Sequence, residues 1–258
     1  MTDPLETQLI LSTFPGIGLL DIAFEELGAC IVRGPDTLWG GDIKRFRPPA
    51  GRFDGLIGGP PCQAFSSLRH IVAHVYGPEA VAENLIPEFE RVVAESLPGW
   101  FLMENVPAAP APVVAGYTVV SFKLNNRWLG EVQERKRVFS FGVRGDRRID
   151  LGDFIEIAPL EAFEKVSAVC ASGGSAEQRI RMDGADKPKK ARKHLLSNGG
   201  YISNKTIRES CIRQGLPETF LDKAPFTVEG KQKVIGNGVP LPMGRAIAKA
   251  INEALKTL

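Results

Sequence analysis

The sequence predicts an α/β fold, in which a Rossmann-like sheet carries helices on both faces and a small basic lobe follows it. Two observations favour this fold. Strand-like and helix-like segments alternate over the first hundred residues, and residues 172–205 are rich in glycine, serine, lysine and arginine with little apolar periodicity. Such an alternation of strands and helices is typical of a parallel sheet with helices on both faces.

The expected strands are short apolar runs, and the expected helices place apolar residues at helical spacing. Strands are expected at Gln8–Phe14, Ala29–Val32, Gly55–Ile57 and Trp100–Met103. Helices are expected at Leu19–Leu27, at Glu79–Ser96 despite Pro87, and at Leu241–Leu258. The last helix returns after the basic region, so we expect it to pack back on the sheet.

The composition excludes several classes of protein. The chain has 258 residues, of which 43% are hydrophobic and 24% charged, as in ordinary globular proteins. No apolar run approaches the ~20 residues that cross a bilayer, and the N-terminus lacks the pattern of a signal peptide. The four cysteines and three histidines show no zinc-ligand spacing. We therefore expect a cytoplasmic protein with reduced thiols, no membrane contact and no metal.

Positive charge is concentrated in one part of the chain. Between Lys165 and Arg213 there are eleven Lys or Arg residues against four Asp or Glu, whereas the net charge of the whole chain is only +2. Such a basic block suggests contact with a polyanion such as nucleic acid. A solvated loop explains it equally well, and the charge alone leaves both interpretations open.

A glycine-containing loop, FPGIG at residues 14–18, follows the first expected strand. Glycines there let the backbone approach a ligand at the carboxyl edge of the sheet. A dinucleotide fingerprint would place a third glycine at position 21, which is Asp21, and this counts against NAD or FAD. The motif alone fits a structural turn as well as a cofactor loop.

Cys62 lies in the segment GGPPCQAFS at residues 58–66, directly after an expected strand. The prolines stiffen the loop that orients its side chain, and nearby amides and cations would favour the nucleophilic thiolate. Glu104 follows another expected strand and faces the same edge. Partial burial would favour its protonated form, so that it acts as an acid at neutral pH. Each residue alone also has a purely structural explanation.

Two further blocks carry polar groups. In QERKR at residues 133–137, Arg135 and Arg137 alternate with their neighbours, so on a strand both would project to one face. Paired guanidinium groups suit a phosphate or a base carbonyl, although exposed charged strands are common. The segment GNGVP at residues 236–240 is by itself a turn before a helix.

Taken in order, these five blocks resemble the signature of the bacterial and phage cytosine-C5 DNA methyltransferases: F-x-G-x-G, P-C-Q-x-F-S, E-N-V, Q-x-R-x-R and G-N-x-V-P. A weaker sixth block, Arg208-Glu209 followed by QGLP at residues 214–217, is similar to that family's R-E…Q-G-F-P segment. The blocks span residues 14–240, nearly the whole chain. The resemblance implies S-adenosylmethionine-dependent methylation of cytosine C5 in double-stranded DNA, with covalent catalysis and base flipping.

The resemblance also implies a role for each catalytic residue. Cys62 attacks C6 of the cytosine, and Glu104 bonds the N3 edge and shares its proton there. Arg135 is expected to reach the base O2, with Arg137 supporting the loop and the carboxylate. The chemistry of the residues agrees, because C5 is a poor nucleophile until a thiolate adds at C6 and a proton donor acts at N3. The target base must first be rotated out of the stacked duplex.

For the cofactor, the resemblance implies that Phe14 packs on the adenine, with Gly16 and Gly18 near the methionine end. The stretch 32–42 is compressed relative to the family, and in it we assign Asp36 to the ribose, Asp42 to the adenine amino group and Trp39 to a second stacking face. The remaining expected cofactor residues are Leu19, Pro60, Asn237 and Val239, of which Asn237 also ties the two domains together. The expected DNA-binding residues are Gln63, Ser66, Lys189, Lys190, Arg192 and Lys193, with Ser66 on a phosphate.

We expect three regions: residues 1–145 as the catalytic and cofactor-binding domain, 146–232 as a small target-recognition region, and 233–258 as a segment that returns to the catalytic domain. The expected protein is a monomer that acts on double-stranded DNA in a bacterial or phage-infected cell. A tRNA cytosine-C5 methyltransferase and a catalytically silent DNA-binding relative remain as alternatives. The silent relative is disfavoured because Cys62, Glu104 and both arginines are present.

Overall fold

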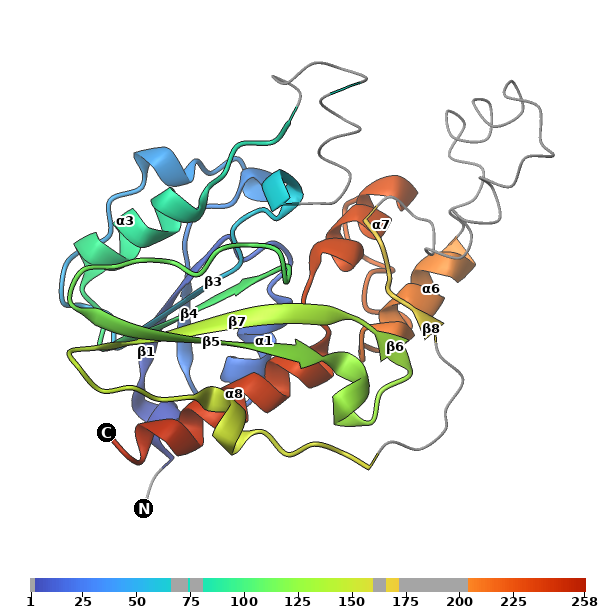
Figure 1. The fold of residues 1–258 in the computed structure, drawn as a ribbon. Helices are drawn as coiled ribbons and strands as arrows, with labels where there is room; N and C mark the ends of the chain where they lie inside the picture. Colours follow the sequence, from blue (N-terminus) through green and yellow to red (C-terminus); the bar gives the residue numbers. More distant parts are fainter. Residues whose placement is uncertain (1–2, 66–73, 75–80, 160–165, 172–203) are drawn as a thin grey trace.

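The structure, a computed structural model, describes residues 3–65, 74, 81–159, 166–171 and 204–258. A six-stranded sheet in the order β2-β1-β3-β4-β7-β5 forms its centre (Figure 1). The strands are β1 (Leu9–Thr13), β2 (Cys30–Arg33), β3 (Gly55–Gly58), β4 (Trp100–Asn105), β5 (Tyr117–Asn125) and β7 (Lys136–Arg144). β1 to β4 run parallel, whereas β7 runs antiparallel to both β4 and β5.

Helices cover both faces of the sheet, and a smaller group of elements lies at one end of it (Figure 1). The longer helices are α1 (Leu19–Glu25), α3 (Ile86–Ser96), α6 (Asn204–Arg213), α7 (Val228–Asn237) and α8 (Leu241–Leu255). Short 3-10 turns occupy Pro4–Thr7, Thr37–Trp39, Ile43–Arg45, Gln63–Phe65, Asn126–Leu129 and Leu151–Phe154. Two short strands, β6 (Gln133–Glu134) and β8 (Val166–Ser167), pair in a separate sheet beside α6 and α7. The expected α/β fold is thereby confirmed.

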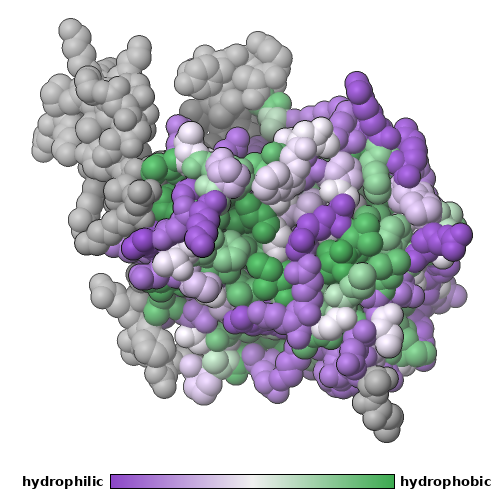
Figure 2. All heavy atoms as spheres, turned by 180° about the vertical axis from the view of Figure 1, so that it is seen from behind, coloured by the Kyte–Doolittle hydropathy of each residue, from purple (hydrophilic) through white to green (hydrophobic). Residues whose placement is uncertain are grey.

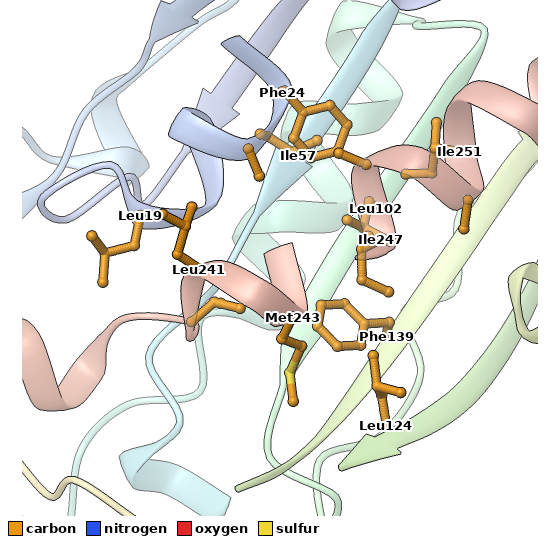
Figure 3. Close-up of a cluster of buried hydrophobic side chains, with 14 of the residues drawn as sticks. Leu19, Phe24, Ile57, Leu102, Leu124, Phe139, Leu241, Met243, Ile247 and Ile251 are labelled. Carbon is orange, nitrogen blue, oxygen red and sulfur yellow. The ribbon is translucent and has the colours of Figure 1, made fainter. Parts of the chain in front are cut away.

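The two faces of the sheet are filled by alternate residues of the same strands. Leu102 of β4 and Ile57 of β3 join the core with α1 and α8, and Figure 3 shows them beside Phe24 and Ile247. The next residue along β4, Phe101, belongs instead to the core with α3. Burial of each such side chain contributes about 1.5–3 kcal/mol, so both faces need a covering helix.

Two expected elements differ from the structure. The sheet is mixed and not wholly parallel, because β7 runs antiparallel to both of its neighbours, and the apolar pattern did not reveal the β5–β7 pair. The helix expected at Glu79–Ser96 begins only at Ile86, with Pro87 in its first turn. Proline is favoured there, since its fixed φ suits a helix start and the first-turn N–H groups have no partner within the helix.

The expected boundary after residue 145 falls inside the main body of the molecule. Leu151 is fully buried in the same core as α8, so the chain leaves the main body only beyond the 3-10 turn at Leu151–Phe154. Ile207 and Cys211 of α6 also join this core. The described part of the expected target-recognition region therefore packs directly on the catalytic body.

The surface of the molecule carries both hydrophobic and hydrophilic residues. On the face opposite to that of Figure 1, hydrophobic atoms lie in patches separated by hydrophilic ones (Figure 2). Interruption of apolar by polar atoms is ordinary for a folded protein surface. Among the described residues, no helix is both long and apolar enough to cross a membrane.

Candidate active site

A cavity of about 850 Å³ opens at the carboxyl ends of the parallel strands. Its sheet side is formed by the ends of β1, β3 and β4, represented by Thr13, Gly58 and Glu104. Its other side is formed by α7, which contributes Lys233 and Asn237. In open parallel sheets, ligands bind at this edge, and the volume lies in the range of small-molecule sites.

Cys62 and Glu104 line this cavity together. Cys62 is half-buried at the end of the loop that leaves β3. Asn105 holds that loop, since its Nδ2 donates to the Pro60 carbonyl at 3.1 Å. The packing is tight at Gly59, where a Cβ would lie 3.1 Å from Glu104 Oε2. The loop and the end of β4 therefore fix the thiol and the carboxyl relative to each other.

Glu104 forms an ion pair with Arg137. Glu104 is 8% exposed, and the distance from Arg137 Nε to Glu104 Oε1 is 2.6 Å. Among the described residues that oxygen has no aligned hydrogen bond, so the contact is chiefly electrostatic. The strand register explains the ion pair. Phe139 of β7 lies opposite Glu104, and Arg137, two residues before Phe139, is on the same face of β7. A long side chain at that diagonal position can reach Glu104.

Arg135 lies in a different environment from Arg137. Its guanidinium is buried and donates to the carbonyls of Val169, Gly236 and Gly238 at 3.0, 2.9 and 3.0 Å. It is not among the residues that line the cavity. Burial, together with the nearby charge of Arg137, lowers the pKa of Arg135 to about 9, although Glu104 has an opposing effect.

The expectation that both arginines project to one face is therefore corrected. Arg135 falls between β6 and β7, where the chain passes from the two-stranded sheet to the six-stranded one. Alternation along a strand holds only while the strand continues, so the two guanidinium groups reach different places. Arg137 faces the cavity, whereas Arg135 joins the end of α7 and the segment after β8 to the main body.

Two buried glutamines complete this junction. Gln133 donates to the Arg213 carbonyl at 2.6 Å and accepts from the Val169 amide at 2.9 Å. Gln214 donates to the Ile235 carbonyl at 2.6 Å. Buried polar groups normally find partners of this kind. The glutamines of the Q-x-R-x-R and Q-G-L-P blocks thus connect the small lobe to α7.

The glycine loop forms the other end of the cavity. Phe14 has a φ of +54° and Gly16 a φ of +55°. Glycine adopts this left-handed conformation freely, but an aromatic residue there is strained by about 1–3 kcal/mol, and such strain is concentrated at functional sites. Asp36 fixes the loop, because its Oδ2 accepts from the Gly16 amide at 2.9 Å and its Oδ1 from the Leu38 amide at 2.7 Å.

Trp39 and Gly18 lie beside the cavity and do not line it. Gly18 caps α1 with a φ of +77°. Trp39 is 60% exposed, and its Nε1 donates to the Gly16 carbonyl at 2.9 Å. Its ring packs against Phe226, with centroids 5.8 Å apart and planes at 48°. Trp39 therefore supports the loop from outside, which differs from the expected stacking face.

Most of the residues selected from the sequence meet in this one cavity. Those that line it are Phe14, Gly16, Leu19, Asp36, Asp42, Pro60, Cys62, Gln63, Glu104, Arg137, Asn237 and Val239. Five residues expected to bind DNA lie outside the described residues: Ser66, Lys189, Lys190, Arg192 and Lys193. Among the described residues, no cluster of three His, Cys, Asp or Glu side chains is placed to hold a metal.

Several residues that line the cavity were not selected from the sequence, and four of them bear on the site. Asp21, which counted only against a dinucleotide fingerprint, accepts from Ser12 Oγ at 2.6 Å and Arg33 Nε at 2.7 Å. Burial raises the pKa of Asp21, opposed by these two hydrogen bonds. The other three are Phe226, Gly230 and Lys233. Gly230 and Lys233 lie seven and four residues before Asn237, and residues at this spacing share one face of a helix. The spacing could therefore have identified both residues from the sequence.

Comparisons with known proteins place the chain among methyltransferases. A family model described as C-5 cytosine-specific DNA methylase matches residues 39–112. The type II methyltransferase M.NgoPII of Neisseria gonorrhoeae is 30% identical, with 96% of each chain covered. M.FnuDI of Fusobacterium nucleatum, also a type II methyltransferase, is 25% identical, with 95% of this chain and 94% of the relative covered.

Solved structures show the same fold. The methyltransferase EhMeth of Entamoeba histolytica has a TM-score of 0.58 at 12% identity, covering 96% of this chain and 98% of its own. A variant of Spodoptera frugiperda DNMT2 has a TM-score of 0.56 at 15% identity, covering 97% and 99%.

The relatives that match nearly the whole chain are methyltransferases, and the sheet with its cavity at the carboxyl edge has the fold of the solved methyltransferase EhMeth. The chain belongs to the C-5 cytosine-specific DNA methylase family, because one relative reaches 30% identity over nearly its whole length. Its enzymatic class is therefore DNA (cytosine-5-)-methyltransferase. The alignment with M.NgoPII runs over 334 residues, although this chain has only 258, so the chain is a compact member of the family.

Proposed function

We propose that the chain transfers the methyl group of S-adenosylmethionine to C5 of a cytosine that is flipped out of double-stranded DNA, through covalent addition of Cys62. One observation carries the proposal. Cys62, Glu104 and Arg137 line the same cavity as the glycine loop and Asp36. A nucleophile, a proton donor and a place for the methyl donor therefore share one enclosed space.

The residues present fit S-adenosylmethionine. The strained Phe14 offers an aromatic face at one end of the cavity. Asp36 retains lone pairs for the ribose hydroxyls, because each carboxylate oxygen accepts one backbone hydrogen bond and can accept another. Asp42 lies beside it for the adenine amino group, and Asn237 lies across the cavity. When bound, the cofactor supplies a methyl group on a sulfonium, ready for a carbon nucleophile.

Cys62 begins the reaction as a thiolate that adds to C6 of the cytosine. The electrons of the C5–C6 double bond move into the ring, and Glu104 delivers a proton at N3 so that no full charge builds up there. C5 thereby becomes nucleophilic and accepts the methyl group. A base then removes the C5 proton, the C5–C6 double bond forms again as the Cys62 thiolate leaves, and N3 returns its proton to Glu104.

Arg137 is the residue we propose for the base O2. It shares the cavity with Cys62 and already pairs with Glu104 at 2.6 Å. A guanidinium beside O2 and N3 stabilises negative charge on the ring. Arg135 does not line the cavity and is committed to three main-chain carbonyls, so its proposed role is to hold the junction on which Asn237 depends.

The burial of the two catalytic residues supports base flipping. Cys62 and Glu104 are half-buried and buried at the sheet edge, and a base stacked in a duplex would not reach them. Rotating the base out costs a few kcal/mol. We propose that Gln63, Ser66 and the basic run Lys189, Lys190, Arg192 and Lys193 hold the surrounding DNA, and that the enzyme acts as a monomer in the cytoplasm of a bacterial or phage-infected cell.

Methyl transfer from labelled S-adenosylmethionine tests the proposal. Duplex DNA and tRNA are offered in parallel, with Cys62→Ala as the blank for each. We expect label in duplex DNA alone, and bisulfite sequencing of DNA from expressing cells then gives the target sequence. Label in tRNA and none in DNA would instead favour the tRNA alternative, and no transfer to either would favour a catalytically silent relative.

A further inference from the structure

Phe226 lines the cavity, although it belongs to none of the sequence blocks that identify the family. It directly precedes α7, where Thr227 caps the helix by accepting from the Gly230 amide at 3.1 Å. The Phe226 amide also donates to the Ala224 carbonyl at 2.8 Å. A turn and a helix cap therefore fix the backbone that carries the ring.

A chain of contacts leads from this ring through Trp39 to the glycine loop. Phe226 packs on Trp39, with centroids 5.8 Å apart, and Trp39 Nε1 donates to the Gly16 carbonyl at 2.9 Å. Asp36 accepts from the amide of the same glycine. Both main-chain polar groups of Gly16 are thus held by residues 36–39, and Phe226 supports those residues from the far end of the chain.

The position of Trp39 shows why this support matters. Its side chain is 60% exposed and lies beside the cavity, so its main described contacts are the hydrogen bond to Gly16 and the ring of Phe226. An indole held by one hydrogen bond keeps considerable freedom, and an aromatic partner restricts it. Phe226 also presents its own ring to the cavity, where a bound ligand would cover it.

We propose that Phe226 is a positioning residue for the methyl donor: it braces Trp39, and through Trp39 the glycine loop, and lines the cavity beside them. This inference rests on the proposed binding of S-adenosylmethionine. It makes cofactor affinity depend on the segment that joins the small lobe to α7. The chemical step, which takes place at Cys62 and Glu104, does not involve the ring.

Titration calorimetry without DNA tests the inference, with S-adenosylhomocysteine as the ligand. Phe226→Ala should weaken binding roughly tenfold, in line with the removal of an aromatic contact together with its buried area. Phe226→Tyr keeps the ring and should bind as wild type does. The matched control is Phe220→Ala, which removes an exposed ring from the same segment but outside the cavity. It should leave affinity unchanged.

Kinetics and fluorescence separate positioning from general damage. For Phe226→Ala, KM for S-adenosylmethionine should rise about tenfold while kcat at saturating cofactor stays within about twofold. Trp39 is far more exposed than Trp100, which is 2% exposed, so its emission should change when S-adenosylhomocysteine binds. That change should disappear in Trp39→Phe and be reduced in Phe226→Ala.

Wild-type affinity in Phe226→Ala, or an equal loss in Phe220→Ala, would overturn the inference. If Phe226→Ala does not fold, Phe226→Leu replaces it, and unaltered cofactor affinity in that variant would count against the inference in the same way. Failure of the wild type itself to bind S-adenosylhomocysteine and to use S-adenosylmethionine would defeat the proposed function. Binding and turnover by the wild type, with no effect at Phe226, would defeat only the inference about Phe226.

Discussion

The two walls of the cavity are built in different ways. The sheet wall carries Cys62 and Glu104 at the ends of strands that are buried on both faces. The opposite wall is one face of α7 and the residue before it, Phe226, which reach the cavity from the last part of the chain. Groups held on the sheet can make the precise contacts of a reaction, whereas α7 forms a wall that holds a ligand in place.

This difference predicts that changes in the sheet wall act on the chemical step and changes in the helical wall act on binding. Arg135 stands between the two, because it lies next to β7 but bonds to residues around the end of α7. Variants on each wall therefore test whether the division is real.

Cys62→Ser should have the largest effect, a loss of turnover of at least about 10⁴-fold. A serine hydroxyl is barely ionised at neutral pH and attacks C6 poorly. Methyl transfer to duplex DNA measures the loss, and circular dichroism should show an unchanged fold. Activity within tenfold of wild type would contradict a covalent role for Cys62.

Glu104→Gln should slow methylation by about 10²- to 10⁴-fold, the usual range for removal of a general acid. The amide can still form a hydrogen bond but cannot deliver a proton to N3. Affinity for S-adenosylhomocysteine should remain close to that of wild type. If cofactor binding disappeared before the rate fell, Glu104 would belong to the cofactor end of the cavity and the division into two walls would fail.

Arg137→Met should lower the rate of methylation, whereas Arg135→Met should lower the stability of the fold. Without Arg137, kcat should fall about 10²-fold, with little change in Tm. Without Arg135, three buried carbonyls lose their donor, which should lower the free energy of unfolding by roughly 2–4 kcal/mol. Thermal unfolding and saturation kinetics on both variants distinguish the roles. A stable Arg135→Met with a greatly reduced kcat would return the O2 contact to Arg135.

The smallest effect is expected from the basic run of the small lobe. Neutralising Lys189, Lys190, Arg192 and Lys193 together should weaken DNA binding and flatten its salt dependence, by about 0.9 in log–log slope for each phosphate that the variant no longer neutralises. Binding to a labelled duplex over a series of salt concentrations measures the slope. An unchanged slope would mean that the run is a solvated loop away from the DNA.

The sequence alone located one wall better than the other. Cys62 and Glu104 follow apolar runs that the sequence predicts as buried strands, and parallel strands bring their carboxyl ends to one edge. Arg135 and Arg137 could not be separated from the sequence, because nothing in QERKR reveals that the chain changes sheets at Arg135. The β5–β7 pair was missed for a similar reason, since its pairing with β4 depends on tertiary contacts.

The helical wall was the hardest to predict. Asn237 was found only through its motif, and Phe226 lies in a segment with no repeating pattern. Its place in the cavity depends on how α7 packs, which the Arg135 and Gln214 hydrogen bonds determine. Such contacts join residues that are about twenty to a hundred positions apart, beyond the range of any local pattern.

Trapping on DNA that contains 5-fluorocytosine at the target tests covalent methylation by Cys62 most directly. After Cys62 adds at C6 and the methyl group reaches C5, release requires loss of a proton from C5. Fluorine cannot leave as F⁺, so the account predicts a covalent protein–DNA adduct that forms only with S-adenosylmethionine and survives denaturing electrophoresis. The adduct should be absent with Cys62→Ala. An adduct that persists in that variant, or none with the wild type on DNA that it methylates when unfluorinated, would contradict the account.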